Sequence, residues 1–132
     1  MAIAIDANIA ISWFTGSPAP LAQRALAELA EHGAIVPALW RWEVQDVLLR
    51  LEHAERLTLS AADALLELGQ LPIVVDDELR SLFGNESALA SRYRLRVYDA
   101  AYLELALRRG IPLASIDKEL AQAAKRAGVA YA

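Results

Sequence analysis

The opening stretch Ala2-Ile-Ala-Ile5-Asp6 decides the fold, because a short apolar run ends directly in a carboxylate. Further apolar runs of this kind, which predict β-strands, occupy residues 34–36, 73–75, 113–116 and 129–131. The longer segments between them have the spacing of amphipathic helices. Strands that alternate with helices need crossover connections, so the pattern predicts an α/β fold with a mostly parallel sheet and helices on both faces.

Prolines, glycines and capping residues mark where the helices begin and end. Ser17-Pro18 predicts the start of a helix that stops at Gly33, and Pro37 opens the next one. Ser60 begins a third helix in a pattern that resembles a capping box. The remaining helices are expected over residues 77–93, 98–109 and 118–127.

Length and composition predict one self-sufficient domain over residues 1–132, of which 56% are hydrophobic and 23% charged. The chain has no cysteine, which excludes disulfides, thiolate zinc sites and cysteine nucleophiles. His32 and His53 are its only imidazoles, so any metal is expected to be bound by oxygen.

Charge and hydropathy limit the partners of the protein. The formal net charge of −4 gives no obviously basic nucleic-acid-binding surface, although carboxylates loaded with divalent cations create a cationic site for phosphate. The first residues lack the basic segment of a signal peptide, and no apolar run approaches the ~20 residues of a membrane span. We therefore expect a cytoplasmic protein that does not bind membranes.

Two acids, Asp6 and Asp117, each follow a predicted strand and precede a predicted helix. Ligands of parallel sheets bind in the crevice beyond the carboxyl ends of the strands, which makes both acids candidates for a functional site. The alternative is that each one only caps the helix that follows it. Two such acids in one parallel sheet are expected to be spatial neighbours, and this favours the functional interpretation.

Glu43 lies at an unusual place, about two turns into the helix that Pro37 opens. It is one turn from Trp40 and from Val47, hence near the margin of the buried face. An unpaired buried carboxylate is costly, so Glu43 is expected to find a cation, a hydrogen-bond donor or a metal. The alternatives are an ion pair with Arg41 or Arg50, or plain exposure.

Asp99 lies at the start of a predicted helix, where an acid taken alone indicates a capping residue. Neutral polar groups accompany the other acids, since Asn8 is two residues beyond Asp6 and Ser115 is two residues before Asp117. A set of carboxylates with neutral oxygen partners suits the hard cations Mg²⁺ or Mn²⁺. The chemistry that matches this set is phosphoryl transfer with a metal-activated water.

Four motifs, found in one order along nearly the whole chain, resemble those of the PIN domain, and most closely the VapC-type ribonuclease toxins of toxin–antitoxin pairs. The motifs are Ile5-Asp6-Ala-Asn8, Pro37-Ala-Leu-Trp-Arg-Trp-Glu43-Val44, Tyr98-Asp99-Ala-Ala-Tyr-Leu-Glu-Leu-Ala106 and Leu113-Ala-Ser-Ile-Asp117-Lys-Glu-Leu120. The resemblance implies a five-stranded sheet of order 3-2-1-4-5 and an Mg²⁺- or Mn²⁺-dependent endoribonuclease. It also implies a homodimer and a VapB-like antitoxin that covers the active site.

The resemblance carries roles over to individual residues. Asp6 and Asp99 would bind the metal, while Glu43 and Asp117 would complete the catalytic site. Asn8 and Ser115 match the supporting polar positions of the family. Asp46 departs from the pattern, because many relatives carry asparagine there.

Just before the helix of Asp99, arginines occupy every second position, at Arg92, Arg94 and Arg96. They would place cationic groups close to the acids, where they could position the phosphates of an RNA substrate. The alternative is that they pair with acids such as Glu86 or Asp76.

Three other functions compete with this one. A receiver-type phosphorylation domain has the same size, and Asp76-Asp77 resembles its acidic pair, but in receivers that pair follows the first strand. A PIN-like module that binds RNA without cleaving it is the second alternative. A nuclease that acts on DNA or from chain ends is the third, since no residue visibly reads a 2′-hydroxyl.

Overall fold

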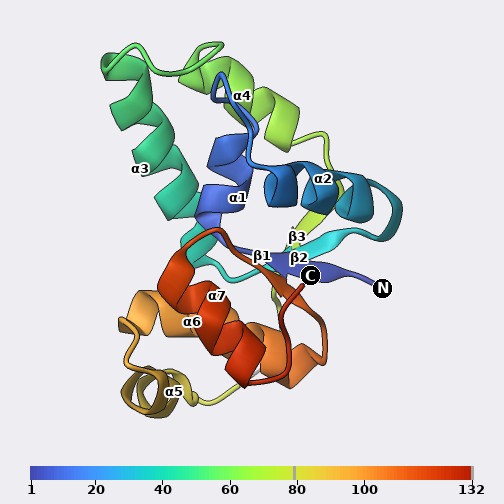
Figure 1. Ribbon diagram of the computed structural model, residues 1–132, viewed down its shortest axis with the longest axis vertical. Helices are drawn as coiled ribbons and strands as arrows, with labels where there is room; N and C mark the ends of the chain where they lie inside the picture. The colour runs from blue at the N-terminus through green and yellow to red at the C-terminus, as the bar shows by residue number, and fades with distance from the viewer. Residues whose placement is uncertain (79, 132) are drawn as a thin grey trace.

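The computed structural model describes residues 1–78 and 80–131, in which short strands form one parallel sheet (Figure 1). The strands are β1 (Ile3–Ile5), β2 (Ala34–Val36), β3 (Ile73–Val75) and β4 (Leu113–Ala114). Their order across the sheet is β3-β2-β1-β4, with parallel pairing throughout. The predicted α/β class with a parallel sheet is confirmed.

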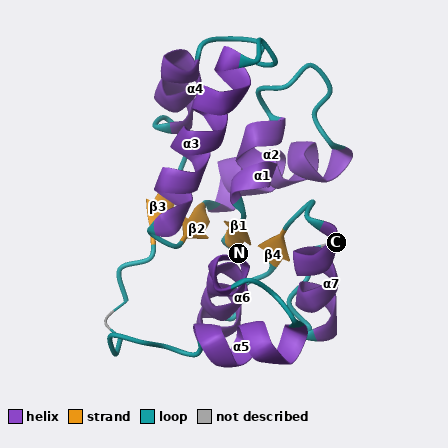
Figure 2. Ribbon diagram, turned by 90° about the vertical axis from the view of Figure 1, so that its left-hand side faces the viewer, coloured by secondary structure: helices purple, strands orange, loops and turns teal. Residues whose placement is uncertain are grey.

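Helices cover both faces of the sheet, as predicted (Figure 2). One layer holds α1 (Ala7–Ser12), α2 (Pro20–His32), α3 (Leu39–His53) and α4 (Ala61–Leu68). The other layer holds α5 (Glu86–Tyr93), α6 (Val97–Arg109) and α7 (Lys118–Arg126). No helix in the described part of the chain is both long and apolar enough to cross a bilayer.

The core is densest around β1, whose three residues are all buried. Both layers of helices pack against this strand with aliphatic side chains, including Leu29 of α2 and Leu103 of α6, which are fully buried. Complete burial of a leucine stabilises a fold by roughly 1.5–3 kcal/mol, so this two-sided packing fixes β1 firmly. The residue that follows β1 is therefore held in a defined position.

The predicted fifth strand is not formed within the described residues. Residues 129–131 contribute one isolated parallel bridge, between Leu113 and Ala130. It lies beside β4, on the side where the fifth strand of the order 3-2-1-4-5 was expected. β4 itself has only two residues, because the chain leaves the sheet at Ser115, and it cannot support a longer ladder.

Two helix predictions were wrong. The second helix begins at Pro20 rather than Pro18, because Ser12 Oγ accepts a hydrogen bond from Ala19 N at 2.8 Å and fixes the preceding turn. The helix predicted over 77–93 forms only at Glu86–Tyr93. Most of the missing part is a loop tied down by ion pairs of Arg80, while residue 79 lies outside the described residues.

The strand order also excludes the receiver-type alternative. Receiver-like sheets have the order 2-1-3-4-5, in which β1 lies between β2 and β3. Here β1 lies between β2 and β4. This arrangement places the carboxyl ends of β1 and β4 side by side, in the register that pairs Ile5 with Ala114.

Candidate active site

Asp6 and Ser115 are brought together by the β1–β4 register, since each is the first residue after its strand. Ser115 Oγ donates a hydrogen bond to Asp6 Oδ2 at 2.5 Å, and the Ile9 amide donates to Asp6 Oδ1 at 3.1 Å. Asp6 is thus the N-cap of α1, with only 4% of its surface exposed. Asp6 therefore both caps α1 and lies at the carboxyl end of β1.

Burial and neighbouring carboxylates disfavour the ionised forms of Asp6 and Asp99. Burial raises the pKa of Asp6 to about 6, against the hydrogen bonds from Ser115 and Ile9, and the charges of Asp117 and Asp99 raise it further. Burial and the charge of Asp117 also raise the pKa of Asp99, although Arg96 acts in the opposite direction. A bound cation would relieve this repulsion.

Glu43 lies on α3, half-buried, and its partner comes from another helix. The hydroxyl of Tyr102 on α6 donates a hydrogen bond to Glu43 Oε1. The alternative partners are engaged elsewhere: Arg50 pairs with Asp46 at 3.4 Å, and Arg41 stacks on Trp42. The ion-pair alternative for Glu43 is therefore wrong within the described residues.

Trp40 anchors the start of α3 to the end of β1. Its indole Nε1 donates a hydrogen bond to the carbonyl oxygen of Asp6 at 3.3 Å, and the side chain is 7% exposed. This contact sets the distance between the two segments that carry Asp6 and Glu43. Asp46, the departure from the family pattern, is exposed and pairs with Arg50, which is also exposed.

Asp99 is not a capping residue. The N-cap of α6 is Arg96, and Asp99 lies in the first turn with a half-buried side chain. Asp117, in contrast, does cap its helix, because its Oδ1 accepts hydrogen bonds from the amides of Glu119 and Leu120 at 2.9 and 3.3 Å. The capping interpretation is thus wrong for Asp99 and correct for Asp117.

These acids meet in a small cavity of about 60 Å³ at the carboxyl edge of the sheet. It is lined by Asp6, Ala7, Asn8, Glu43, Val47, Asp99, Tyr102 and Asp117. Five of the six predicted acidic and supporting positions therefore share one cavity, and the sixth, Ser115, binds Asp6. Four segments that are far apart in the chain supply these side chains.

The residues of the cavity fit a hard divalent cation by their chemistry. The polar side-chain atoms that line it are oxygens, apart from the amide nitrogen of Asn8. The pKa of Asp6 is raised mainly by burial and further by the charges of Asp117 and Asp99, which a bound cation would offset. No three acidic or imidazole groups among the described residues are already spaced around one ion position. Hydrogen bonds from Ser115 and Tyr102 hold Asp6 and Glu43 in the arrangement seen here.

Sequence reasoning missed Tyr102 as a member of the site. It is 2% exposed and lines the cavity beside the carboxylates. The spacing from Asp99 to Tyr102 is three residues, which places both side chains on one face of α6. That spacing was the available signal, since a buried tyrosine needs a partner for its hydroxyl.

The alternative interpretation of the three arginines, pairing with Glu86 or Asp76, is wrong. Glu86 pairs with Arg80 at 2.8 Å, and Asp76 pairs with Arg108 and Arg109 at 2.5 and 2.6 Å. Arg92, Arg94 and Arg96 are exposed and form no ion pair in the described part of the chain. Their guanidinium groups are thus available at the surface.

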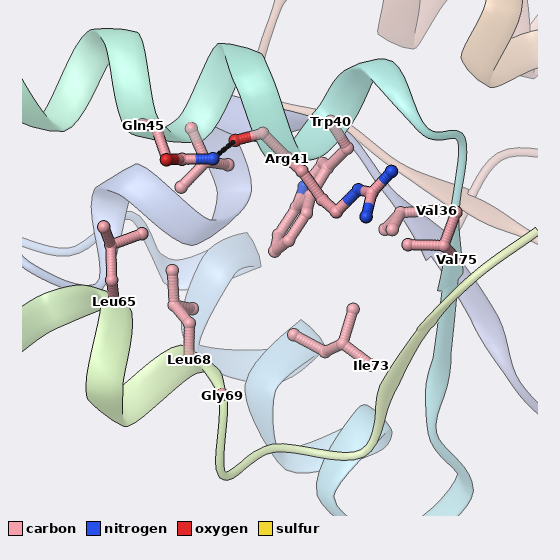
Figure 3. A pocket seen from close by; sticks show the side chains of 10 residues that line it. Val36, Trp40, Arg41, Gln45, Leu65, Leu68, Gly69, Ile73 and Val75 are labelled. Atoms are coloured by element: carbon pink, nitrogen blue, oxygen red, sulfur yellow. Dashed lines mark hydrogen bonds between the residues drawn. The ribbon is translucent and has the colours of Figure 1, made fainter.

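A larger cavity, of about 240 Å³, lies between α3, α4 and β3 (Figure 3). Aliphatic side chains such as Leu68 and Ile73 and the ring of Trp40 line it, and Arg41 is its one ionisable residue. Arg41 O accepts a hydrogen bond from Gln45 Nε2 at 2.9 Å on its rim. It lacks the acids that hydrolysis needs, so the smaller cavity is the candidate active site.

Comparisons with known proteins agree with this fold. The sequence matches the PIN domain family over residues 3–126. It is 40% identical over 98 residues to Ribonuclease VapC3 of Mycobacterium tuberculosis, in strains CDC 1551 / Oshkosh and ATCC 25618 / H37Rv, and the alignment covers 74% of this chain and 69% of the relative. The fold is similar to the crystal structure of PAE2754 from Pyrobaculum aerophilum, with a TM-score of 0.72 and 19% identity, over 99% of this chain and 88% of that one. The chain therefore belongs to the PIN-domain family, and within it to the VapC-type proteins.

Proposed function

We propose that this protein is an Mg²⁺- or Mn²⁺-dependent endoribonuclease that acts as the toxin of a toxin–antitoxin pair. One observation supports this most strongly: Asp6, Glu43, Asp99 and Asp117 line a single cavity at the carboxyl edge of a parallel sheet. The relationship to a curated VapC ribonuclease makes RNA the substrate to test first.

In this proposal Asp6 and Asp99 bind the cation, and Glu43 and Asp117 complete the site. A cation bound there would activate water for in-line attack and would stabilise charge on the phosphodiester. Ser115 and Ile9 orient Asp6, so that its carboxylate cannot rotate freely. Asn8, exposed at the mouth of the cavity, can donate a hydrogen bond to a substrate oxygen.

RNA needs cationic groups outside the cavity, because the acids repel phosphate. Arg92, Arg94 and Arg96 are exposed in the segment that leads to Asp99. We assign them the positioning of substrate phosphates, which carries affinity without sequence preference. Replacing Arg94 and Arg96 with alanine should then weaken RNA binding and make its salt dependence shallower.

The partners in this proposal are those of a VapC-type toxin: an RNA substrate, a VapB-like antitoxin that covers the active site, and a second copy of the chain in a homodimer. The place of action is the cytoplasm, where RNA and antitoxin are both present. Coexpression with the neighbouring reading frame and size-exclusion chromatography would test the antitoxin and the homodimer.

The decisive experiment is cleavage of a panel of structured RNAs under single-turnover conditions, with Mn²⁺ and with EDTA. Wild-type protein should cleave only with the metal, and Asp99→Ala should lose cleavage by a large factor while its circular dichroism spectrum stays unchanged. Glu31→Gln, which removes an exposed acid from α2, is the matched control. Wild-type cleavage by Asp99→Ala would refute the assignment.

A PIN-like module that binds RNA without cleaving it is the other outcome of this experiment. It would give metal-independent RNA binding and no cleavage of any RNA in the panel. Parallel assays with single-stranded DNA and with end-labelled RNA separate an endoribonuclease from a DNA-directed or exonucleolytic enzyme.

A further inference from the structure

We propose that the cleft between α5 and α7 is a second nucleotide-binding site, which holds the RNA strand outside the catalytic cavity. The proposal rests on the proposed function in taking RNA as the substrate. It adds residues of α7, which the sequence analysis did not connect with RNA, and a position for the strand on the surface.

The cleft has a volume of about 200 Å³ and combines an aromatic wall with cationic groups. It is lined by Tyr93, Arg94, Glu119, Gln122, Ala123 and Arg126. Tyr93 is half-buried and packs against the core, so its ring is a fixed surface. The C-terminal end of α5 and one face of α7 supply its walls, and both helices belong to the lower layer (Figure 1).

Two guanidinium groups lie against the ring of Tyr93. Those of Arg92 and Arg126 are both 5.5 Å from its centroid, although the two residues belong to different helices. A guanidinium that stacks on an aromatic ring keeps its N–H donors in one plane, and this geometry matches the oxygens of a phosphate. Neither arginine forms an ion pair with any described residue.

The local charge is opposite to that of the whole chain. The protein carries a formal net charge of −4, yet the cleft is lined by two arginines, Arg94 and Arg126, and by one acid, Glu119. Arg92 lies against the ring of Tyr93, which forms one wall. Arg94 adopts φ 56°, ψ 48°, a left-handed conformation that glycine would occupy more easily. The excess of positive charge beside a half-buried aromatic ring suits the phosphates of a single strand of nucleic acid.

Helix α7 and its N-cap contribute residues to both the cleft and the catalytic cavity. Asp117 lines the cavity and begins α7, whereas Glu119 and Arg126 line the cleft further along the same helix. Nine residues of helix span about 13 Å, which is a reach of only a few nucleotides. At the start of α6, the guanidinium of Arg96 lies 5.5 Å from the ring of Tyr98, which is 60% exposed.

This arrangement defines a path for the substrate. Tyr98 offers an exposed stacking surface to a base, and Arg96, Arg94 and Arg126 offer donors to the phosphates. Stacking on aromatic rings tolerates any base, so the path contributes affinity and direction rather than sequence preference.

The test is fluorescence anisotropy with a labelled single-stranded oligoribonucleotide in EDTA, which prevents cleavage during the measurement. Arg126→Ala should lower RNA affinity roughly three- to tenfold, and the salt slope should decrease by about 0.7 for the lost phosphate contact. Arg24→Ala, which removes an exposed arginine from α2 in the opposite layer, should bind as wild type. Arg126→Lys, which keeps the charge but not the planar fork, should recover only part of the affinity.

Each other outcome overturns the proposal. Equal affinities of Arg126→Ala and Arg24→Ala would make Arg126 an ordinary surface residue, and absence of RNA binding by the wild type would remove the site altogether. A loss of binding to a polyglutamate peptide without a loss of RNA binding would assign the cleft to an acidic protein segment. Failure of the nuclease activity is recognised separately, because wild-type protein would then bind RNA but not cleave it with Mn²⁺.

Discussion

Tyr102 on α6 donates its hydroxyl hydrogen to Glu43 on α3, and this bond joins the two layers of helices across the catalytic cavity. Burial and the neighbouring carboxylate raise the pKa of Tyr102, so the phenol stays protonated and remains a donor. The carboxylate of Glu43 is thereby held at one orientation by a neutral group.

Tyr102→Phe should slow RNA cleavage about tenfold with little change in KM, because the ring still packs while Glu43 loses its orienting donor. Loss of a hydrogen bond to a charged group costs roughly 1–3 kcal/mol in unfolding free energy, less where solvent reaches the carboxylate. Single-turnover cleavage, urea denaturation and the Mn²⁺-induced shift in melting temperature measure the three effects. Unchanged kcat together with lower stability would show a purely structural role.

The pKa of Asp6 predicts how the metal-free protein responds to pH. Its folded-state value of about 6 lies above the ordinary 3.8, so its stabilising contribution is complete below pH 3.8 and is lost as the pH rises through 6. The loss is up to about 3 kcal/mol at neutral pH. Asp6→Asn keeps a capping side chain and should remove this pH dependence in EDTA.

Urea denaturation between pH 4 and pH 8 in EDTA checks this expectation. The Asp6→Asn protein should be more stable than wild type at pH 8 and should differ little at pH 4. Glu31→Gln serves as the control for a general change in charge. A wild-type protein that gains stability across this range, relative to Asp6→Asn, would contradict the sign.

Asp76 has the opposite pH dependence. Burial would raise its pKa, but hydrogen bonds from Arg108 and Arg109 outweigh burial and lower it to about 2. The stabilisation is therefore present above the ordinary value of 3.8 and is lost as the pH falls toward 2. Asp76→Asn should cost about 1–3 kcal/mol at pH 7, and acid unfolding of wild type and variant should converge near pH 2.

Much of the fold follows from the sequence because strands and helices alternate with clear turn signals. The strand predicted over 113–116 was too long, since the Ser115 hydroxyl bonds to Asp6 and draws the chain out of the sheet. The helix predicted from residue 77 failed because Arg80 pairs with Glu86 and Glu104. Such ion pairs join residues distant in sequence, and periodicity carries no information about them.

The composition of the cavity could be predicted from the positions of Asp6 and Asp117 after their strands, together with the family resemblance for Glu43 and Asp99. The roles of these acids stay predictions. Tyr102 was missed although its three-residue spacing from Asp99 was a signal, whereas Arg126 has no distinctive local pattern on its helix. Their importance comes from what lies opposite them in space, Glu43 in one case and Tyr93 in the other.

Asp99 lies in the first turn of α6 without capping it. Its pKa is raised by burial and by the charge of Asp117, so the ionised side chain destabilises the metal-free protein. Asp99→Asn should therefore be at least as stable as wild type in EDTA at pH 7.5. Mn²⁺ should raise the melting temperature of wild type by mass action, and that of the variant far less.

Thermal melts of both proteins, in EDTA and in millimolar Mn²⁺, decide between a ligand and a helix-dipole residue. A carboxylate that only interacts with the dipole of α6 contributes about 0.3–1 kcal/mol, so its loss would lower the melting temperature by a few degrees in EDTA. It would leave the response to Mn²⁺ unchanged. If Asp99 is a metal ligand, Asp99→Asn is at least as stable as wild type in EDTA, because removing its charge removes repulsion among the acids. Its melting temperature then rises far less with Mn²⁺, because the cation has lost a ligand.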